Sequence, residues 1–184
     1  NKKSTKPLSV PTEFVSNNIG GTIGSAQIKS SSKILLVVGD KKTFKLDNLK
    51  IDDGLLNIEA SIDDGSILAS ALLKNIPIEP LLAMPGHKIV GRLDGTIKAQ
   101  GTVNDPHLSG QLKLSSAKYD YKQYGIKLKD ISSTIKANGK LINFSEISAK
   151  DRFGNSLQGD GKVSLTEQYA FSFNMASKKL NPIN

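Results

Sequence analysis

The stretch from Ile89 to Leu114 alternates between apolar and polar side chains, and it constrains the fold more than any other part of the chain. Apolar residues and glycines occupy the odd positions up to Val103, and charged or polar residues fill most positions between them. A period of two is typical of a β-strand with one dry and one wet face. Asn104-Asp105-Pro106 interrupts the pattern, which resumes in even phase at Leu108. We therefore expect a long β-hairpin.

Turn signals separate alternating runs elsewhere in the chain. Asp-Asp-Gly occurs at 52–54 and 63–65, and Asn138-Gly139 follows later. Asp-Gly and Asn-Gly are strong hairpin signals because both residues accept positive φ. The apolar run Ile34–Val38 predicts a buried strand, and a phase shift predicts a β-bulge near Ser145-Glu146. Together these patterns predict an all-β antiparallel meander.

One segment departs from the alternating pattern of apolar and polar residues. Ile76–Met84 contains two prolines, and proline is tolerated at the first position of a helix, so a short helix is expected near 77–84. Residues 1–12 are basic and polar and predict a connector, residues 13–177 one β domain, and residues 178–184 a polar tail. The first residue is not Met, and no run of about 20 apolar residues occurs. We expect a segment of a longer protein, with any membrane anchor outside it.

Composition excludes several classes of function. The 184 residues include no cysteine, which removes disulfide frameworks, zinc knuckles and thiol catalysis. The formal net charge of +8 allows an acidic partner such as a phospholipid surface or nucleic acid. An AT-rich genome, which favours Lys, Asn and Ile, would produce the same bias, so we do not infer a basic binding patch.

No motif indicates catalysis or metal binding. His87 and His107 both lie in Pro-containing turns without partners to complete a metal site, so we expect both on turn surfaces. Lys118–Gly125 mixes tyrosines with lysines, as a single-strand nucleic-acid site would, but a strand with solvated lysines is the preferred interpretation. Ser-x-x-Lys occurs at 30–33 and 115–118 without its supporting elements. We expect no enzyme, no cofactor, no metal and no nucleic-acid partner.

The dry face of the strands therefore carries the functional argument. It could be an ordinary sandwich core, in which two sheets fill each other's gaps. It could instead be a curved sheet whose apolar face stays partly unfilled, because inward glycines leave room for another chain or a ligand. The residues alone leave both interpretations open. The glycines in phase with the apolar positions are Gly91, Gly95, Gly101, Gly110, Gly159 and Gly161.

The order of motifs in the chain is similar to that of a known family. Gly91 to Gly95 reads Gly-x-Leu-x-Gly, and Pro106 to Gly110 reads Pro-x-Leu-x-Gly. A Gly-x-x-Leu-x-Asp-Ile step follows from Gly125 to Ile131, and Gly154 to Leu165 reads Gly-x-x-x-x-Gly-x-Gly-x-x-x-Leu. With these motifs the chain resembles the C-terminal region of TamB (translocation and assembly module subunit TamB) and its AsmA-like relatives, most clearly over residues 65–184.

This resemblance implies a large envelope protein that is anchored in the inner membrane of a Gram-negative bacterium and reaches across the periplasm. Its sheet would fold lengthwise into a taco-like groove with an apolar interior. Two roles come with the resemblance. One is transport of phospholipids between the inner and outer membranes. The other is assistance in outer-membrane β-barrel assembly with a TamA-type partner.

We thus expect a groove that holds phospholipid acyl chains, with head groups at a wet rim near Arg92 and Lys98. The alternatives are a scaffold that offers a sheet edge to nascent barrel strands, and a sealed β-sandwich or solenoid module of an adhesin. The residues expected to line the groove are Ile89, Leu93, Ile97, Leu108, Leu112, Ile135, Phe144, Leu157, Val163, Phe171 and Phe173.

Overall fold

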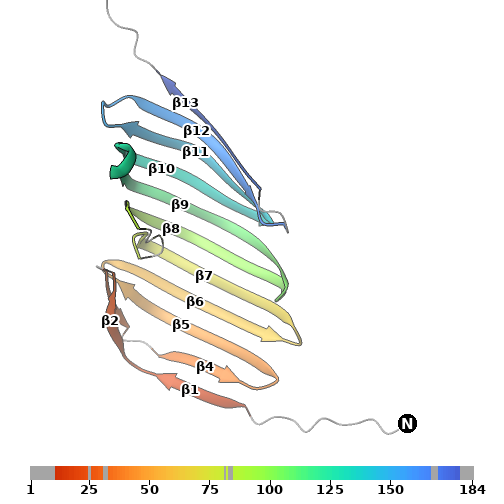
Figure 1. Ribbon diagram of the computed structural model, residues 1–184. Helices are drawn as coiled ribbons and strands as arrows, with labels where there is room; N and C mark the ends of the chain where they lie inside the picture. The colour runs from red at the N-terminus through yellow and green to blue at the C-terminus, as the bar shows by residue number, and fades with distance from the viewer. Residues whose placement is uncertain are drawn as a thin grey trace, which may run out of the picture.

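The protein forms a single open layer of antiparallel strands (Figure 1). The computed structural model describes residues 11–24, 26–30, 33–80, 82, 85–166 and 170–178. Within them, one 13-stranded sheet holds every strand, so the architecture is not a sandwich of two separate sheets. The prediction of an all-β antiparallel meander in one groove-shaped sheet is confirmed.

The elements are, in chain order, β1 (Thr12–Ser16), β2 (Ile19–Ile23), β3 (Ala26–Ser30), β4 (Ile34–Val38), β5 (Lys41–Ile51), β6 (Gly54–Asp63), β7 (Ser66–Pro77), β8 (His87–Thr102), β9 (Asp105–Tyr121), the 3₁₀ turn η1 (Lys122–Tyr124), β10 (Ile126–Gly139), β11 (Leu141–Asp151), β12 (Ser156–Ser164) and β13 (Ala170–Lys178).

From β4 onwards each strand pairs with the next one in the sequence, and β1 adds beside β4. The hairpin β2–β3 stands off this path, because β3 pairs with β5 beyond the end of β4. The hairpin predicted over Ile89–Leu114 is formed by β8 and β9. The strand predicted over Ile34–Val38 is β4, but Leu36 and Val38 are exposed, so the prediction that it is buried is wrong.

Of the predicted turns, the one at Asp64-Gly65 is confirmed and the one at Asn138-Gly139 is shifted by one residue. Asp64 and Gly65 both have positive φ between the paired residues Asp63 and Ser66, as the Asp-Gly signal predicts. After β10 the loop is Gly139-Lys140, one residue later than predicted, because Asn138 still pairs with Leu141.

The helix expected near 77–84 is absent from the described residues of that segment, while residues 81, 83 and 84 lie outside the description. β7 instead stays extended through Pro77, because Ile76 and Ile78 are both buried against the sheet at alternating positions. A single hydrogen bond from the Leu82 N–H to the Ile78 carbonyl, 3.1 Å long, closes one turn. Burial of two isoleucines thus outweighs the helix-starting preference of proline.

The ends of the chain bear on the predicted domain bounds. Residues 1–10 of the expected connector and 179–184 of the expected tail lie outside the described residues. The sheet itself runs from Thr12 to Lys178 as one connected set of strands.

Five strands contain a β-bulge of the same design. In each, two apolar residues are separated by two polar ones, and the second polar residue has a φ between 51° and 55° at a shift in register. Asn and Asp tolerate this left-handed backbone better than most residues. The bulge near Glu146 was predicted and is confirmed. The five steps are Leu46–Leu49, Leu73–Ile76, Leu114–Ala117, Leu128–Ile131 and Phe144–Ile147.

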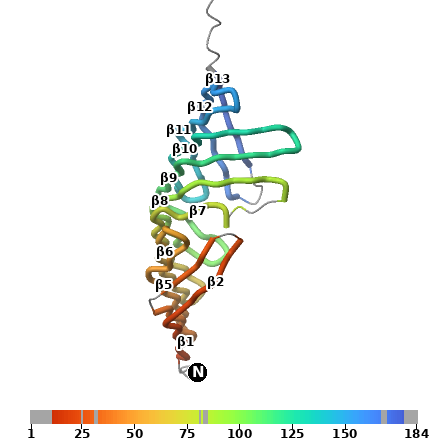
Figure 2. Tube along the Cα trace, turned by 90° about the vertical axis from the view of Figure 1, so that its left-hand side faces the viewer, coloured from red at the N-terminus to blue at the C-terminus, as the bar shows by residue number. Residues whose placement is uncertain are grey.

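At two of the bulges, a side chain on the neighbouring strand accepts a hydrogen bond from a backbone N–H that has left the regular ladder. The Asn48 N–H donates to Asn57 Oδ1 at 2.6 Å, and the Asn75 N–H donates to Asp94 Oδ1 at 2.8 Å. A bulge bends its strand and increases the local twist. Figure 2 shows the result: the β2–β3 hairpin and the ends of β8–β10 project from the plane of the other strands. We call this line of bending the crease.

The most deeply buried side chains lie at the crease. Ala26, Ile51, Leu73 and Ile76 form a cluster, with Leu93 among the residues packed against it. Because the described strands form no second layer, the sheet buries these residues by bending over its own apolar face.

Replacement of Ile76 by alanine is expected to lower the free energy of unfolding by about 3 kcal/mol, because it leaves a cavity where the sheet packs on itself. The Ile76 side chain is only 1% exposed, whereas Leu68 on the same strand is 62% exposed. Leu68→Ala should therefore change stability by less than about 0.5 kcal/mol. Urea unfolding followed by circular dichroism measures both. Equal losses in the two variants would contradict a core at the crease.

Candidate apolar groove

One face of the sheet is apolar from edge to edge. In an antiparallel sheet, directly paired residues point to the same side, so the registers trace rows of side chains across the strands. Two such rows contain no charged residue. The first is Ser16, Ile34, Leu46, Ile58, Ala71, Ile97, Gly110, Ala137, Ile142, Val163 and Phe171. The second is Ser30, Leu49, Leu56, Leu73, Gly95, Leu112, Ile135, Phe144, Gly161 and Phe173.

Every residue predicted to line the groove lies on this apolar face. Most belong to the two rows, and the others pair within the same face, as Leu93 does with Leu114 and Leu157 with Ala149. Most are half-buried, but at the β13 edge Phe171 is 78% exposed and Phe173 is 49% exposed. That the face holds lipid stays a prediction.

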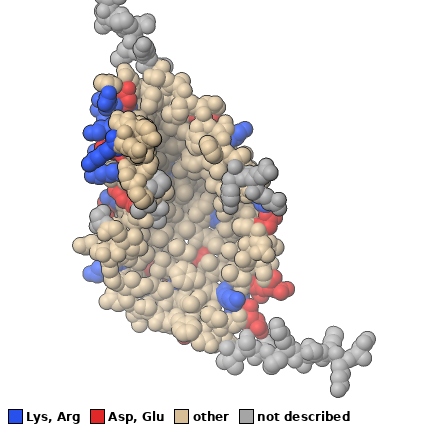
Figure 3. All heavy atoms as spheres, viewed as in Figure 1, with Lys and Arg blue, Asp and Glu red and all other residues tan. Residues whose placement is uncertain are grey.

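The apolar face is the concave one. Viewed as in Figure 1, its middle is hollowed and mostly uncharged, and most of the charged side chains in view gather along the margins (Figure 3). The opposite face carries the polar side chains that alternate with the apolar ones. One of its rows reads Thr96, Gln111, Lys136, Asn143, Lys162 and Ser172.

A separate hollow of about 520 Å³ lies over β5–β8. Its lining includes the side chains that point away from the apolar face, among them Lys41, Lys45, Glu59, Ser70 and Lys98. It therefore belongs to the wet face. Lys98 lies there, on the outside of the bent sheet, and not at a rim of the groove as expected.

The glycines of the apolar face do not leave open space. A Cβ at Gly95 would lie 2.1 Å from the Gln111 carbonyl oxygen, and one at Gly161 would lie 2.2 Å from the Phe173 ring. Gly95 and Gly110 also have φ of 134° and 129°, which favours glycine. These glycines mark places where the backbone bends sharply or a neighbouring side chain folds across the strand. The expectation that they make room for a ligand is wrong.

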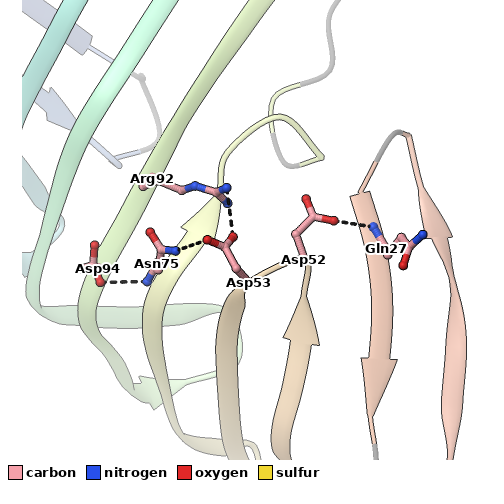
Figure 4. A network of polar contacts seen from close by, with 6 residues as sticks. All are labelled: Gln27, Asp52, Asp53, Asn75, Arg92 and Asp94. Atoms are coloured by element: carbon pink, nitrogen blue, oxygen red, sulfur yellow. Dashed lines mark hydrogen bonds and ion pairs between the residues drawn. The ribbon is translucent and has the colours of Figure 1, made fainter.

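A network of hydrogen bonds and an ion pair stabilises the crease on the face opposite the apolar one (Figure 4). The Arg92 Nη2 atom lies 3.0 Å from Asp53 Oδ1, and the Asn75 side-chain amide donates to Asp53 Oδ2 at 2.8 Å. Arg92 and Asp94 flank Leu93 on β8, which places them on the wet face. Arg92 thus supports the bend and does not lie at the rim where a head group was expected.

The β2–β3 hairpin is tied to the same corner. The Gln27 N–H donates to Asp52 Oδ1, and the Asp52 N–H donates to the Gln27 carbonyl, both at 2.8 Å. Asp52 has positive φ in the β5–β6 turn. The Asp-Asp-Gly repeat at 52–54 therefore makes a turn, as predicted, and also joins two parts of the crease.

Ion pairs between neighbouring hairpins support the sheet. Lys140 in the β10–β11 turn pairs with Asp105 at the start of β9, and its hydrogen bond lowers the pKa of Asp105. Lys150 lies 3.0 Å from Asp130, whose pKa is lowered mainly by that hydrogen bond. Both pairs are solvent-exposed, so we expect each to add little to stability.

An aromatic cluster occupies the concave face where β8 begins and β9 ends. His87 pairs with Tyr121 in the sheet register, and their rings stack with centroids 4.0 Å apart. The Nδ1 atom of His87 lies 2.7 Å from the Tyr119 hydroxyl, and Tyr124 packs on Tyr121 at 5.0 Å. The expectation that His87 lies on a turn surface is therefore wrong. His107 is exposed on β9, near the β8–β9 turn.

Sequence reasoning missed this cluster because His87 and Tyr119 are separated by 32 positions. The strand register brings them together. The tyrosines at 119 and 121 carried the signal, since they alternate in phase with Ala117 on the apolar face.

Neither a metal centre nor a membrane-spanning helix emerges from the described residues. No group of three or more His, Cys, Asp or Glu residues within them could hold a metal ion. No helix in that part of the chain is long and apolar enough to cross a bilayer.

The fold and the site define a class of protein: an open, one-layer all-β sheet that is bent around an unpartnered apolar face. In comparisons with known proteins, no family model, no curated protein and no solved structure matches the chain.

Proposed function

We propose that this chain is a segment of a TamB/AsmA-like lipid conduit, in which phospholipid acyl chains lie in the apolar groove and pass between the inner and outer membranes of a Gram-negative bacterium. The observation that carries the proposal is the apolar face that continues across the path from β1 to β13, with no second layer of strands over it among the described residues. An exposed apolar surface larger than a few hundred Å² is typical of a binding site. The periplasmic setting and the inner-membrane anchor follow from the resemblance.

The dimensions of the groove suit acyl chains. Strands that are paired about 4.8 Å apart make the path from β1 to β13 roughly 48 Å long, and one acyl chain spans about 15 Å of a bilayer core. Several chains could therefore lie in series. Because the two traced rows hold no charged side chain, a chain could slide along them without meeting one specific site.

The test is native mass spectrometry of the purified protein together with lipid extraction. We expect bound phospholipid, because the groove offers apolar surface that water would otherwise cover. A lipid-free protein that stays monomeric and folded, and that takes up no phospholipid from vesicles, would refute the conduit proposal.

A second candidate function is a scaffold for outer-membrane β-barrel assembly with a TamA-type partner. The observation that favours it is the pair of sheet edges: β1 and β13 each have a described neighbour on one side only. An exposed edge offers unpaired backbone groups to an incoming strand.

Because the chain has no cysteine, a single cysteine can report on such pairing. We expect Asn174→Cys on β13 to form disulfides with cysteines in the strands of a nascent barrel protein if the scaffold role holds. Asn143→Cys on the interior strand β11 is the matched control, because Asn143 is already paired with Lys136 on one side and with Lys162 on the other. Equal cross-linking at the two positions would argue against edge pairing.

A further inference from the structure

The aromatic cluster lies at the outer end of one wall of the groove, which is formed by the first part of β8 and the last part of β9. Along β9 the apolar face runs from Tyr121 and Tyr119 inward to Ala117, which is only 1% exposed at the crease. On β8 the same wall runs from His87 inward to Gly91. The outer end of this wall is polar and aromatic, whereas its inner end is apolar and closed.

We propose that His87 and Tyr119, with Tyr121 stacked on the imidazole, bind the phosphate head group of a glycerophospholipid whose acyl chains extend down this wall to the crease. The inference rests on the conduit function proposed above. It adds where the head group lies and how the lipid is oriented, and it assigns residues to the head group that differ from those expected at the rim.

The hydrogen bond between His87 and Tyr119 leaves one donor free. A neutral imidazole has one N–H, and the tyrosine has one O–H. Since the 2.7 Å contact uses one of these two hydrogens, the other is available in either tautomer. Stacking on Tyr121 holds the imidazole plane in place. A preorganised donor at the border of an apolar surface suits a phosphate oxygen, and tyrosine and histidine rings favour such borders.

The charges at this end also suit an anion. Lys122, which follows Tyr121, is exposed at this end, whereas Lys88 pairs with Asp120 in the sheet register and so lies with it on the wet face. Asp120 is the opposing carboxylate there, and Lys127 Nζ lies 3.8 Å from it. In Figure 3, Lys and Arg side chains gather along the margin where Figure 1 places η1 and the ends of β10 and β11.

The wall matches the length of an acyl chain. The four residue-to-residue steps from Tyr121 to Ala117 cover about 13 Å at roughly 3.3 Å per residue. The hydrocarbon of one leaflet is about 15 Å thick. A lipid with its phosphate at His87 would therefore reach the crease with its chain ends, where the sheet bends over its own apolar face.

In the test, the delipidated protein is incubated with vesicles that contain phosphatidylglycerol and diacylglycerol with the same acyl chains. The lipids bound to the protein are then extracted and counted. We expect the phospholipid to be taken up about tenfold or more in excess, because a hydrogen bond to a charged group contributes to binding on that scale. The double variant His87→Phe/Tyr119→Phe keeps two aromatic rings and removes the donors, so its excess should fall to near one with total lipid unchanged. His107→Phe, on an exposed histidine of β9, is the control and should behave as the wild type.

Four results would overturn the inference. Equal uptake of both lipids by the wild type, or an undiminished excess in a folded double variant, removes the head-group site but leaves the conduit intact. Failure of the wild type to take up either lipid refutes the conduit and this site together. Should the double variant not fold, Lys122→Gln changes only one exposed side chain. That variant should lower the excess at least threefold, and an unchanged excess would likewise overturn the inference.

Discussion

Replacement of Ile97 by arginine is expected to abolish phospholipid co-purification while the sheet stays folded. Ile97 lies near the middle of an apolar row, between Ala71 on β7 and Gly110 on β9, and it is half-buried. A cation there would have to lose its water to admit an acyl chain, which costs several kcal/mol. We expect lipid occupancy, measured by native mass spectrometry, to fall more than tenfold.

A matched control comes from the opposite face. Leu68 on β7 points away from the groove and is 62% exposed, so Leu68→Arg should retain lipid at the wild-type level. Leu93→Arg is a less informative probe, because Leu93 packs against the buried cluster at the crease and the variant would also lose stability. Wild-type lipid occupancy in a folded Ile97→Arg variant would show that the apolar face does not hold the lipid.

Replacement of Gly95 by alanine is expected to lower the free energy of unfolding by about 3 kcal/mol. The φ of Gly95 is 134°, and its new Cβ would lie 2.1 Å from the Gln111 carbonyl oxygen. A strained backbone and an overpacked contact each cost about 1–3 kcal/mol. Urea unfolding followed by circular dichroism measures the loss.

Gly20 on β2 is the control for this prediction. A Cβ at Gly20 would meet nothing within 4 Å, so Gly20→Ala should change stability by less than about 0.5 kcal/mol. If Gly95→Ala were as stable as Gly20→Ala, the sharp bend at Gly95 would not be needed for the fold.

Local patterns in the sequence suffice to predict much of the sheet. The alternation over Ile89–Leu114 and the Asp-Gly turn at 64–65 correctly indicate β8, β9 and the β6–β7 hairpin. They succeed because one face of each strand is drier than the other, and because Asp and Gly accept the positive φ that a tight turn requires.

The sequence also contains a signal for the bulges, although only the one near Glu146 was predicted. At each bulge two apolar residues are three positions apart in the sequence, as Leu73 and Ile76 are, in a strand whose apolar residues otherwise lie two positions apart. The prolines that follow the Leu73–Ile76 step instead favoured the prediction of a short helix near 77–84. The repeated phase shift was the available signal.

Other features depended on how the strands meet. The contact between His87 and Tyr119 exists only because the register of β8 and β9 aligns them. The same holds for Arg92, whose ion pair with Asp53 places it at the crease. Contacts between residues distant in sequence follow from pairing and bending, which local propensity does not specify.

The sequence by itself determined that this chain forms antiparallel strands with one apolar and one polar face, because the alternation of side chains is a local property. Only the tertiary structure decided that the apolar face is concave and open. Bulges in five strands bend the sheet in one direction, and the glycines allow backbone to approach backbone where it bends. The curvature, and with it the groove, is a sum over many strands that no single stretch of sequence contains.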